Sequence, residues 1–349
     1  MATLSWLGYD YARIIFRKWV SISLPLPQDI GVSEEAKHPV GGVDYPRTLA
    51  EFDEWFSSEA KCGEFLRRLR WPHGFECPGC GCCGGGWHTG RGLVRCPECG
   101  RQTSTIAGTL FEGPRKPLRV WFQAIWYVTN QKHGVSALGL QRVLGLGSYQ
   151  TAWTWLHKLR RAMVRPGRER LMGEVEVDEA FLGGEGEDIA GRGTDRSLIV
   201  IAAEVRGRGT GRIRMACVED ASAESLIPFI EHTVVEGSLI RTDGWSGYGP
   251  LSRSRYQHRP RSLRATRLPA HVAMPRVHRV ASLLKRWWLG TYHGGISDPH
   301  LEYYLNEFTF RFNRRTSKAR GLLFYRLVQQ AVQMDAVPYH QLRGGGHNR

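Results

Sequence analysis

Two pairs of cysteines constrain the first part of this chain more than any other feature. The pairs form C-x-x-C knuckles separated by 15 residues, and their members are Cys77, Cys80, Cys96 and Cys99. Knuckles with this spacing bring four thiolates to one tetrahedral Zn²⁺, and the intervening hairpin returns the chain. The segment is too poor in apolar residues to build a core, so metal would hold it together. The sequence therefore predicts a structural zinc ribbon.

The remaining cysteines do not form a disulfide pattern. Seven of the 8 cysteines fall between Cys62 and Cys99. Cys82 and Cys83 are spare thiols beside the first knuckle, and Cys217 is typical of an ordinary buried cysteine. With no secretion signal at the start of the chain, this usage predicts a reducing cytoplasm. A run of about 18 apolar residues is also missing, so no membrane span is expected.

The charge balance predicts a polyanionic partner. The chain has 349 residues, enough for more than one domain, and a formal net charge of +15. A surplus of this size most often serves nucleic-acid binding, although a basic surface without such a partner is the alternative.

The segment after the cysteines is predicted to be helical. One or two short helices are expected within residues 46–70. Further helices are expected from Pro117 to residue 129, after a Ser136 cap, and from a Ser148 cap to about residue 163. Residues 135–163 fit either a DNA-binding helix-turn-helix or a plain helical connector. In the first case Trp153, Leu156 and Leu159 face the core. The more exposed residues, His157 among them, then include the DNA contacts Lys158, Arg160 and Arg161.

From Glu174 the pattern changes to short β-type runs. Three strands precede a helix over residues 221–235, a strand at residues 238–244 follows, and helices are expected at 278–290 and 299–312. This order predicts an α/β domain with a mixed sheet.

Two aspartates lie in this α/β segment where an acid is costly. Asp178 is inside an apolar strand and Asp243 ends another. Such acids need compensation, and carboxylate oxygens suit Mg²⁺. Two aspartates on adjacent strands fit a pair of ions that activates a nucleophile at phosphorus. The alternative is that each aspartate caps a strand or turn.

A basic tract follows Asp243. No Asp or Glu occurs from residue 244 to 297, a stretch that attracts phosphates unless it is merely a solvated basic loop. Its aromatic residues Tyr256, Trp287, Trp288 and Tyr292 fit stacking or packing. Its cations are Arg253, Arg255, Arg259, Arg261, Arg264, Arg267, Arg276, Arg279, Lys285 and Arg286.

Several segments, taken together, resemble one known family. RWPHGFECPGC, VEVDEAFLGG, RTDGWSGY, HRVASLLKRWWLGTYHGG and YYLNEFTFRFNRR are similar to the zinc-ribbon insertion-sequence transposases of the ISXO type, over about residues 44–333. The resemblance implies a ribonuclease H-like catalytic domain. It also implies a bacterial, nucleoid-associated DDE-type transposase that binds terminal inverted repeats and target DNA, cleaves and joins strands, and acts as a homo-oligomer.

The resemblance assigns roles to particular residues. Asp178 and Asp243 correspond to the first two catalytic acids, whereas the usual third Glu is missing. His278 stands 35 residues after Asp243 and Lys285 seven after His278, so both share one helix face. We expect His278 to be the third ligand for Mg²⁺ or Mn²⁺, with Mn²⁺ favoured, and Lys285 to contact the DNA backbone. The alternatives are that His278 binds phosphate or packs, or that Glu307 swings in.

Other expectations concern DNA contacts and boundaries. Glu179 should point to the opposite face of its strand from Asp178 and is a weaker candidate. Further DNA contacts are expected at Arg279, Arg286, Asn313 and Arg314. The expected parts are an N-terminal extension (1–44), zinc ribbon with preceding helices (45–110), helical DNA-binding segment (111–172), catalytic domain (173–335) and flexible tail (336–349). A non-catalytic regulator, an inactive relic and a nuclease on the same fold remain as rivals.

Overall fold

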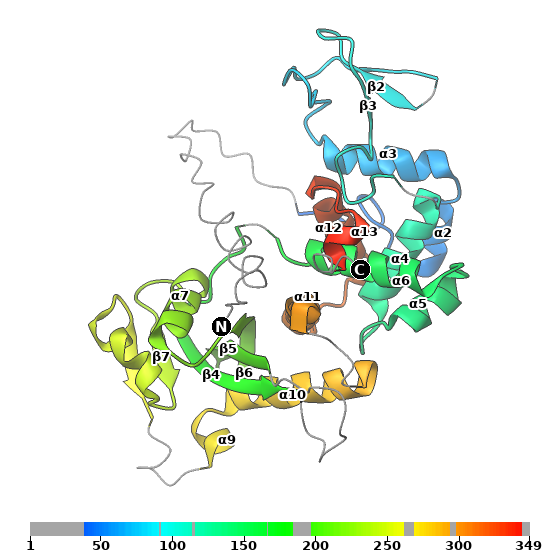
Figure 1. Ribbon diagram of the computed structural model, residues 1–349. Helices are drawn as coiled ribbons and strands as arrows, with labels where there is room; N and C mark the ends of the chain where they lie inside the picture. The colour runs from blue at the N-terminus through cyan, green and yellow to red at the C-terminus, as the bar shows by residue number, and fades with distance from the viewer. Residues whose placement is uncertain are drawn as a thin grey trace, which may run out of the picture. The chain divides into compact units, whose positions relative to one another are not determined.

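A mixed sheet lies at the centre of the second half of the chain (Figure 1). The computed structural model describes residues 38–90, 92–113, 116–165, 167–183, 197–261, 269–293 and 298–343. Most of the expected N-terminal extension, the cations Arg264 and Arg267 and the end of the tail lie outside the described residues.

The sheet has five strands in the order β6-β5-β4-β7-β8. β4, β5 and β6 pair antiparallel, whereas β7 runs parallel to β4 and β8 runs parallel to β7. This mixed arrangement confirms the α/β, ribonuclease H-like expectation, although β8 was not anticipated. The strands are β4 (Glu174–Leu182), β5 (Ser197–Arg206), β6 (Gly209–Val218), β7 (Leu239–Thr242) and β8 (Gln257–Pro260).

Helices cover both faces of the sheet, which explains why its central strands are almost continuously apolar. On one face, Leu182 and Ile201 pack with α10 (Pro275–Tyr292) and α11 (Asp298–Asn313). On the other, Val177 and Val200 pack with α7 (Ala223–Thr233) and the 3-10 helix η1 (Ser246–Arg253). Successive β4 side chains therefore point alternately toward α10 and toward α7.

Side-chain caps start several helices of the first half. Ser136 and Ser148 each accept a backbone N–H bond at the start of a helix, which confirms both predicted caps. Gly145, with φ of 59°, ends the helix between them in the left-handed conformation. The helices are α2 (Leu49–Trp55), α3 (Glu59–Arg70), α4 (Leu118–Asn130), α5 (Ala137–Leu144) and α6 (Tyr149–Ala162).

A C-terminal helix completes this helical core. Phe324 of α12 (Arg320–Gln333) packs among Phe52, Phe56 and Phe122. α12 thus contributes to the core of the preceding helices, although it lies within the segment at 173–335 that the sequence assigned to the catalytic domain. The short helices α9 (Ala270–Ala273) and α13 (Tyr339–Leu342) complete the described elements.

The predicted position of α6 is correct, but the prediction of which of its residues are buried and which are exposed is partly wrong. Leu156 and Leu159 are buried as expected, but His157 and Arg160 are also buried, at 0 % and 1 % exposed. Helices α5, α11 and α12 all contact α6, so it has little free surface. The C-terminal half of α6 is a packed core element.

The cysteine-rich segment forms a three-stranded antiparallel sheet. Its strands are β1 (Trp87–His88), β2 (Leu93–Arg95) and β3 (Gln102–Ser104). Its buried apolar core is small and contains Phe75, Cys77, Val94 and Cys96.

No helix in the described ranges combines the length and the apolar character that a membrane crossing requires.

Candidate active site

Asp178 and His278 meet between β4 and α10. Nε2 of His278 lies 3.3 Å from Oδ2 of Asp178, and the two side chains are 30 % and 14 % exposed. This Nε2 is buried and makes no well-formed hydrogen bond within the described part of the chain. A buried nitrogen aimed at a carboxylate without a hydrogen bond fits a pair that a cation would bridge.

A buried acid places His278 at this position. Glu176, 1 % exposed, accepts hydrogen bonds from the backbone N–H groups of Arg276 (2.7 Å) and Val277 (3.0 Å) at the start of α10. Glu176 and Asp178 share one face of β4, so this contact aligns the first turn of α10 with Asp178. Sequence reasoning missed Glu176, although an acid two residues before Asp178 in an apolar strand was a visible signal.

Asp243 directly follows the last residue of β7, the strand next to β4. The parallel pairing of these strands extends to Glu176 and Arg241, and Asp178 and Asp243 each stand two residues farther along, close enough for the charge of Asp243 to act on Asp178. The carboxylate of Asp243 accepts a hydrogen bond of 2.8 Å from the backbone N–H of Trp245. Of the sequence-predicted pair of aspartates, Asp178 therefore lies in β4 and Asp243 lies just beyond the end of the neighbouring strand β7.

The site holds more negative charge than it compensates. Burial raises the pKa of Asp178 to about 7, with further contributions from the carboxylates of Glu179 and Asp243. Burial lowers the pKa of His278, so its imidazole is neutral near pH 7. Partly buried carboxylates beside a neutral imidazole are a suitable donor set for Mg²⁺ or Mn²⁺.

Glu179 belongs to the other face of the sheet, as its place in the strand suggested. The buried hydroxyl of Tyr248 donates a hydrogen bond to Glu179, and Tyr248 packs in the core on the α7 side. Burial raises the pKa of Glu179, and the charge of Asp243 adds to this effect. Glu179 thus adds negative charge near the aspartates from the α7 side of β4.

The alternative third acid, Glu307, is engaged elsewhere. Its carboxylate is 1 % exposed and bonds to Arg160 and Arg311, both at 2.7 Å. Burial alone would raise the pKa of Glu307, but the two guanidinium groups outweigh burial and lower it. The expectation that Glu307 swings into the site has no support in this arrangement.

The four ribbon cysteines form a closed cluster. Sγ of Cys77 lies 3.6 Å from that of Cys99, Sγ of Cys80 lies 3.6 Å from that of Cys96, and all four lie within 4.8 Å of one another. Ligands about 2.3 Å from one tetrahedral Zn²⁺ lie at similar mutual distances. Hydrogen bonds from the backbone of Cys80 and Gly79 lower the pKa of Cys77 to about 6, which favours the thiolate.

The aspartates and His278 are arranged more loosely. Over the described ranges, the ribbon cysteines alone bring three or more ligand atoms within 4.8 Å of one another. Asp178 and His278 are in contact at 3.3 Å, so it is the carboxylate of Asp243 that lies more than 4.8 Å from at least one of them.

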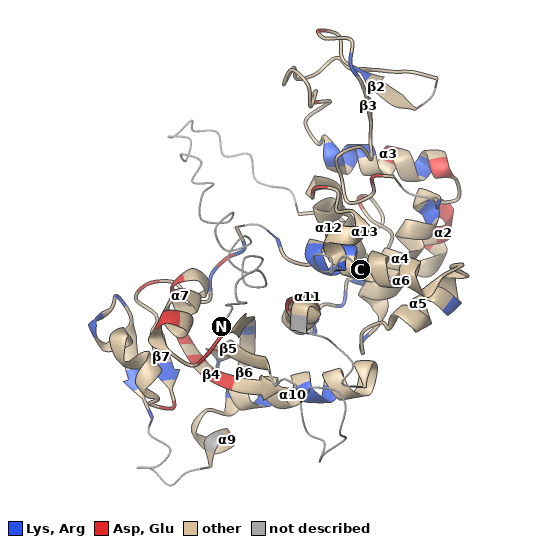
Figure 2. Ribbon diagram, in the orientation of Figure 1, with Lys and Arg blue, Asp and Glu red and all other residues tan. Residues whose placement is uncertain are grey.

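The expected DNA contacts separate into exposed and engaged residues. Arg279, Lys285 and Arg286 are exposed on α10, where Figure 2 shows Lys and Arg along the helix. Lys158 is half-buried, with its ammonium group 6.0 Å from the ring centre of Trp121, and Arg161 is partly exposed. The three cations of α10 are therefore more accessible to DNA than Lys158 and Arg161.

Three other expected contacts have structural roles. The DNA contact at Arg160 is wrong, because its guanidinium is buried against Glu307 and lies 3.9 Å from the ring centre of Tyr304. The Asn313 side chain hydrogen-bonds both the N–H and the C=O of Ile213. The Arg314 guanidinium lies 4.1 Å from the ring centre of Phe310.

Two segments of the chain match known protein families. Residues 170–313 match the ISXO2-like transposase domain, and residues 57–102 match the transposase zinc-ribbon domain. A protein of Halobacterium salinarum, described as an uncharacterized protein in transposable element ISH50, is 27% identical over 287 residues. That alignment covers 73% of this chain and 91% of the relative.

Proposed function

The chain belongs to the ISXO2-like family of zinc-ribbon transposases, and from that premise we propose that it binds the terminal inverted repeats of its own element and cleaves and joins DNA there. The observation that carries this proposal is the contact of Asp178 with His278, with Asp243 just beyond the end of the neighbouring strand. Because an element has two ends, we also propose that more than one copy of the chain binds its DNA. This assembly would form at the nucleoid.

Asp178, Asp243 and His278 would hold divalent metal ions, Mg²⁺ or Mn²⁺. When bound, the metal supplies activation of water and neutralisation of charge at the reacting phosphate. Asp178 in β4 and Asp243 after β7 would provide the negative charge that attracts the cations. His278, kept neutral by burial, provides a nitrogen donor where the family commonly has a carboxylate.

The residues of this chain also supply positioning. The exposed cations Arg279, Lys285 and Arg286 continue along α10 from His278, so they would hold the DNA backbone beside the aspartates. The ribbon would be held by structural Zn²⁺ on four cysteines, and Lys158 and Arg161 would add weaker backbone contacts. Catalysis would then rest on positioning and charge neutralisation, without a covalent intermediate on the enzyme.

Replacement of the aspartates tests the proposal. The substrate is an end duplex, meaning a DNA duplex with the inverted repeat that flanks the coding region. Asp178→Asn and Asp243→Asn are each expected to abolish strand cleavage and transfer while leaving binding of the end duplex intact. Asp53→Asn, an exposed acid outside the site, is the matched control. Full strand transfer by either site variant would refute the assignment.

The wild-type protein separates the proposal from a non-catalytic regulator or an inactive relic. The regulator is favoured by one feature only, the missing third carboxylate. Metal-dependent cleavage of the end duplex by the wild type would exclude both rivals, and cleavage of any DNA without strand joining would favour a nuclease.

A further inference from the structure

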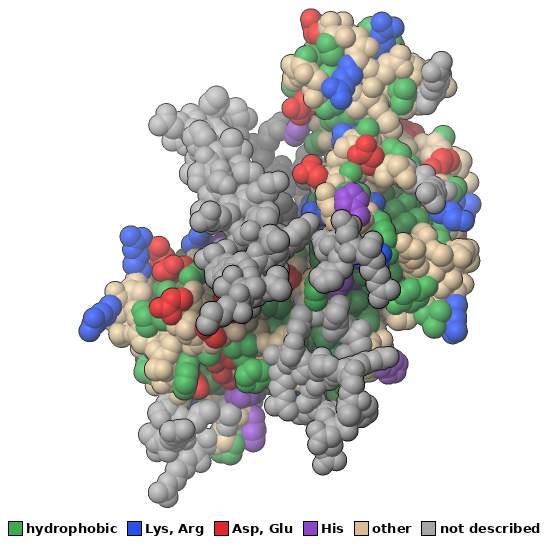
Figure 3. Space-filling model, in the orientation of Figure 1, with side chains coloured by type: hydrophobic (Ala, Val, Ile, Leu, Met, Phe, Trp, Pro, Cys, Tyr) green, Lys and Arg blue, Asp and Glu red, His purple; other side chains and the backbone are tan. Residues whose placement is uncertain are grey.

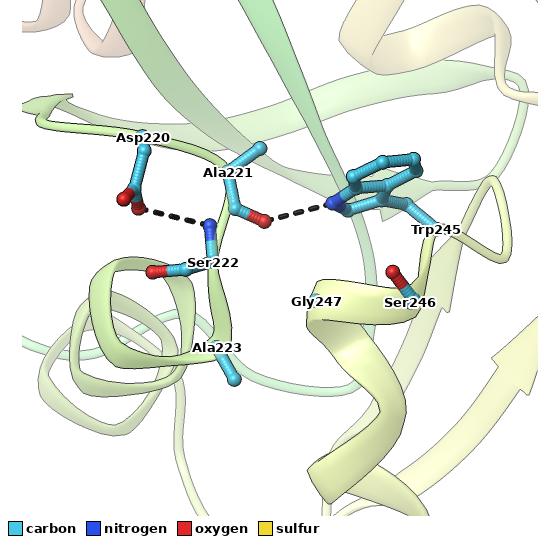
Figure 4. A pocket seen from close by; sticks show the side chains of 7 residues that line it. All are labelled: Asp220, Ala221, Ser222, Ala223, Trp245, Ser246 and Gly247. Atoms are coloured by element: carbon cyan, nitrogen blue, oxygen red, sulfur yellow. Dashed lines mark hydrogen bonds between the residues drawn. The ribbon is translucent and has the colours of Figure 1, made fainter.

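Two adjoining hollows lie beside the candidate site. One, of about 450 Å³, lies between the loop after β6 and the loop after β7 (Figure 4). It is lined by Asp220, Ala221, Ser222, Ala223, Trp245, Ser246 and Gly247. The second, of about 510 Å³, shares Asp220 and Ala221 with the first and extends over Glu179, Phe181 and Leu198. Together the hollows form a groove, here called the loop groove.

Trp245 is held in place in this groove, although half of its surface is exposed. Its indole N–H donates a hydrogen bond of 2.7 Å to the carbonyl of Ala221, as Figure 4 shows, and the residue is 51 % exposed. Gly247 lets the two loops approach, because a Cβ there would lie 2.3 Å from the same carbonyl oxygen. An exposed ring fixed at its polar edge presents an apolar face without a partner among the described residues.

A second ring lies in the other half of the loop groove. Phe181, near the end of β4, is 55 % exposed and lines the second hollow. Large exposed aromatic rings in one groove are more typical of a ligand site than of ordinary surface. The loop groove therefore offers two apolar surfaces to a flat ligand.

The charge of the loop groove decides which part of DNA can enter it. Asp220, Glu219 and Glu179 line it, and on the viewed face of Figure 3 acidic side chains gather around α7 and the strand ends. Hydrogen bonds from Ser222 and Ser225 lower the pKa of Asp220 and keep it ionised. These carboxylates repel phosphate, whereas the amino groups of bases can donate hydrogen bonds to them.

The loop groove is connected directly to the catalytic aspartates. Trp245 stands two residues after Asp243 and donates its backbone N–H to that carboxylate. Glu179, which lines the second hollow, points to the opposite face of β4 from Asp178, so the link from this hollow to the aspartates runs through Asp243, whose charge reaches Glu179. A nucleotide with its base in the groove would therefore have its phosphates near the proposed metal ligands.

We propose, resting on the function proposed above, that the loop groove takes one unpaired DNA base next to the cleaved phosphate and stacks it on Trp245. The base would leave the duplex, and its uncharged ring would replace water on the exposed indole. In this proposal Trp245 binds the end of the element by stacking on the unpaired base.

Photocrosslinking tests the contact without relying on activity. End duplexes carry 5-iodouracil at single positions on either side of the cleavage junction, and full-length protein is irradiated with each. One position adjacent to the junction is expected to crosslink to Trp245, located by mass spectrometry. Formation of the complex with no crosslink to Trp245 at any position would overturn the proposal.

Substitutions give a second, independent reading. Trp245→Leu is expected to lower affinity for an end duplex with an unpaired base at that position about ten- to a hundredfold. Trp245→Phe, which keeps a ring, should retain most of it. Trp87→Leu changes an equally exposed tryptophan of the zinc ribbon and is the control. Equal affinity of Trp245→Leu and wild type would also overturn the proposal.

The outcomes for the two proposals can be distinguished. A protein that cuts the end duplex without contacting it through Trp245 contradicts this inference alone. A protein that crosslinks through Trp245 but never cuts contradicts the proposed catalysis and supports the base contact.

Discussion

Nε2 of His278 lies 3.3 Å from Oδ2 of Asp178, across a helix and a strand that Glu176 fastens together. The relationship depends on one buried carboxylate that caps α10 and one that faces the imidazole. Glu176, on the same face of β4 as Asp178, thus holds the start of α10 and so sets the position of His278, the third expected ligand.

Replacing His278 tests its role as a ligand. His278→Ala is expected to reduce cleavage of the end duplex by about a hundredfold or more, because one metal donor is lost. His278→Glu should raise the activity with Mg²⁺ relative to Mn²⁺, since carboxylate oxygen suits Mg²⁺ better than imidazole does. Cleavage rates with each metal are the measurement. Wild-type rates for His278→Ala would move the role to another residue.

Asp178 should destabilise the metal-free protein at neutral pH. Its folded pKa of about 7 exceeds the ordinary value of 3.8, so the folded state holds a proton that the unfolded state has released. Stability from this group is present below pH 4 and is lost as pH rises toward 7. In EDTA at pH 8, Asp178→Asn should therefore be more stable than wild type by about 2 to 4 kcal/mol.

Urea unfolding at pH 8 and pH 4 measures this difference. The gain of Asp178→Asn should disappear at the lower pH, and Asp53→Asn should show no gain at either. An equal gain at both pH values would mean that packing, and not charge, causes it.

The buried pair of Arg160 and Glu307 should matter for folding and not for DNA. Arg160→Ala leaves the carboxylate of Glu307 with one partner fewer in a site that is 1 % exposed, so a loss of about 3 to 5 kcal/mol in unfolding free energy is expected. The neighbouring Arg161→Ala, partly exposed, should cost less than about 1 kcal/mol. Normal stability with weakened DNA binding in Arg160→Ala would restore the sequence-based interpretation.

Zinc should hold the ribbon but not the helical core. The ribbon has its own small buried cluster, separate from the core around Phe122 and Phe324. Cys96→Ser is expected to release the zinc and open the segment around residues 75–104 to proteases while the helices stay folded. Cys83→Ser, an exposed spare thiol, is the control and should keep one zinc per chain. Retention of that zinc by Cys96→Ser would contradict the assignment.

Local signals were sufficient for most elements and for part of the site. The serines before α5 and α6 and the apolar run around Asp178 predicted helices and a strand that the structure contains. The two aspartates were noticeable because an acid at a buried strand needs compensation. These features are written in a few consecutive residues, so no knowledge of distant contacts was required.

Distant partners explain what the sequence did not reveal. Arg160 looked like a surface cation because its partner, Glu307, is 147 residues away. α12 follows the proposed catalytic segment in sequence but packs with α3, α4 and α6, a relationship that chain order does not indicate. Glu176 was missed because its partners are backbone N–H groups of α10, which residue types do not identify.

An anomalous difference map of the protein bound to an end duplex and Mn²⁺ tests most directly whether Asp178, Asp243 and His278 bind metal. We expect a manganese peak within coordination distance of Asp178 and Asp243, with Nε2 of His278 as a ligand. A manganese peak away from both aspartates would contradict this expectation. So would a peak at the aspartates with His278 still in contact with Asp178 and not bound to the metal.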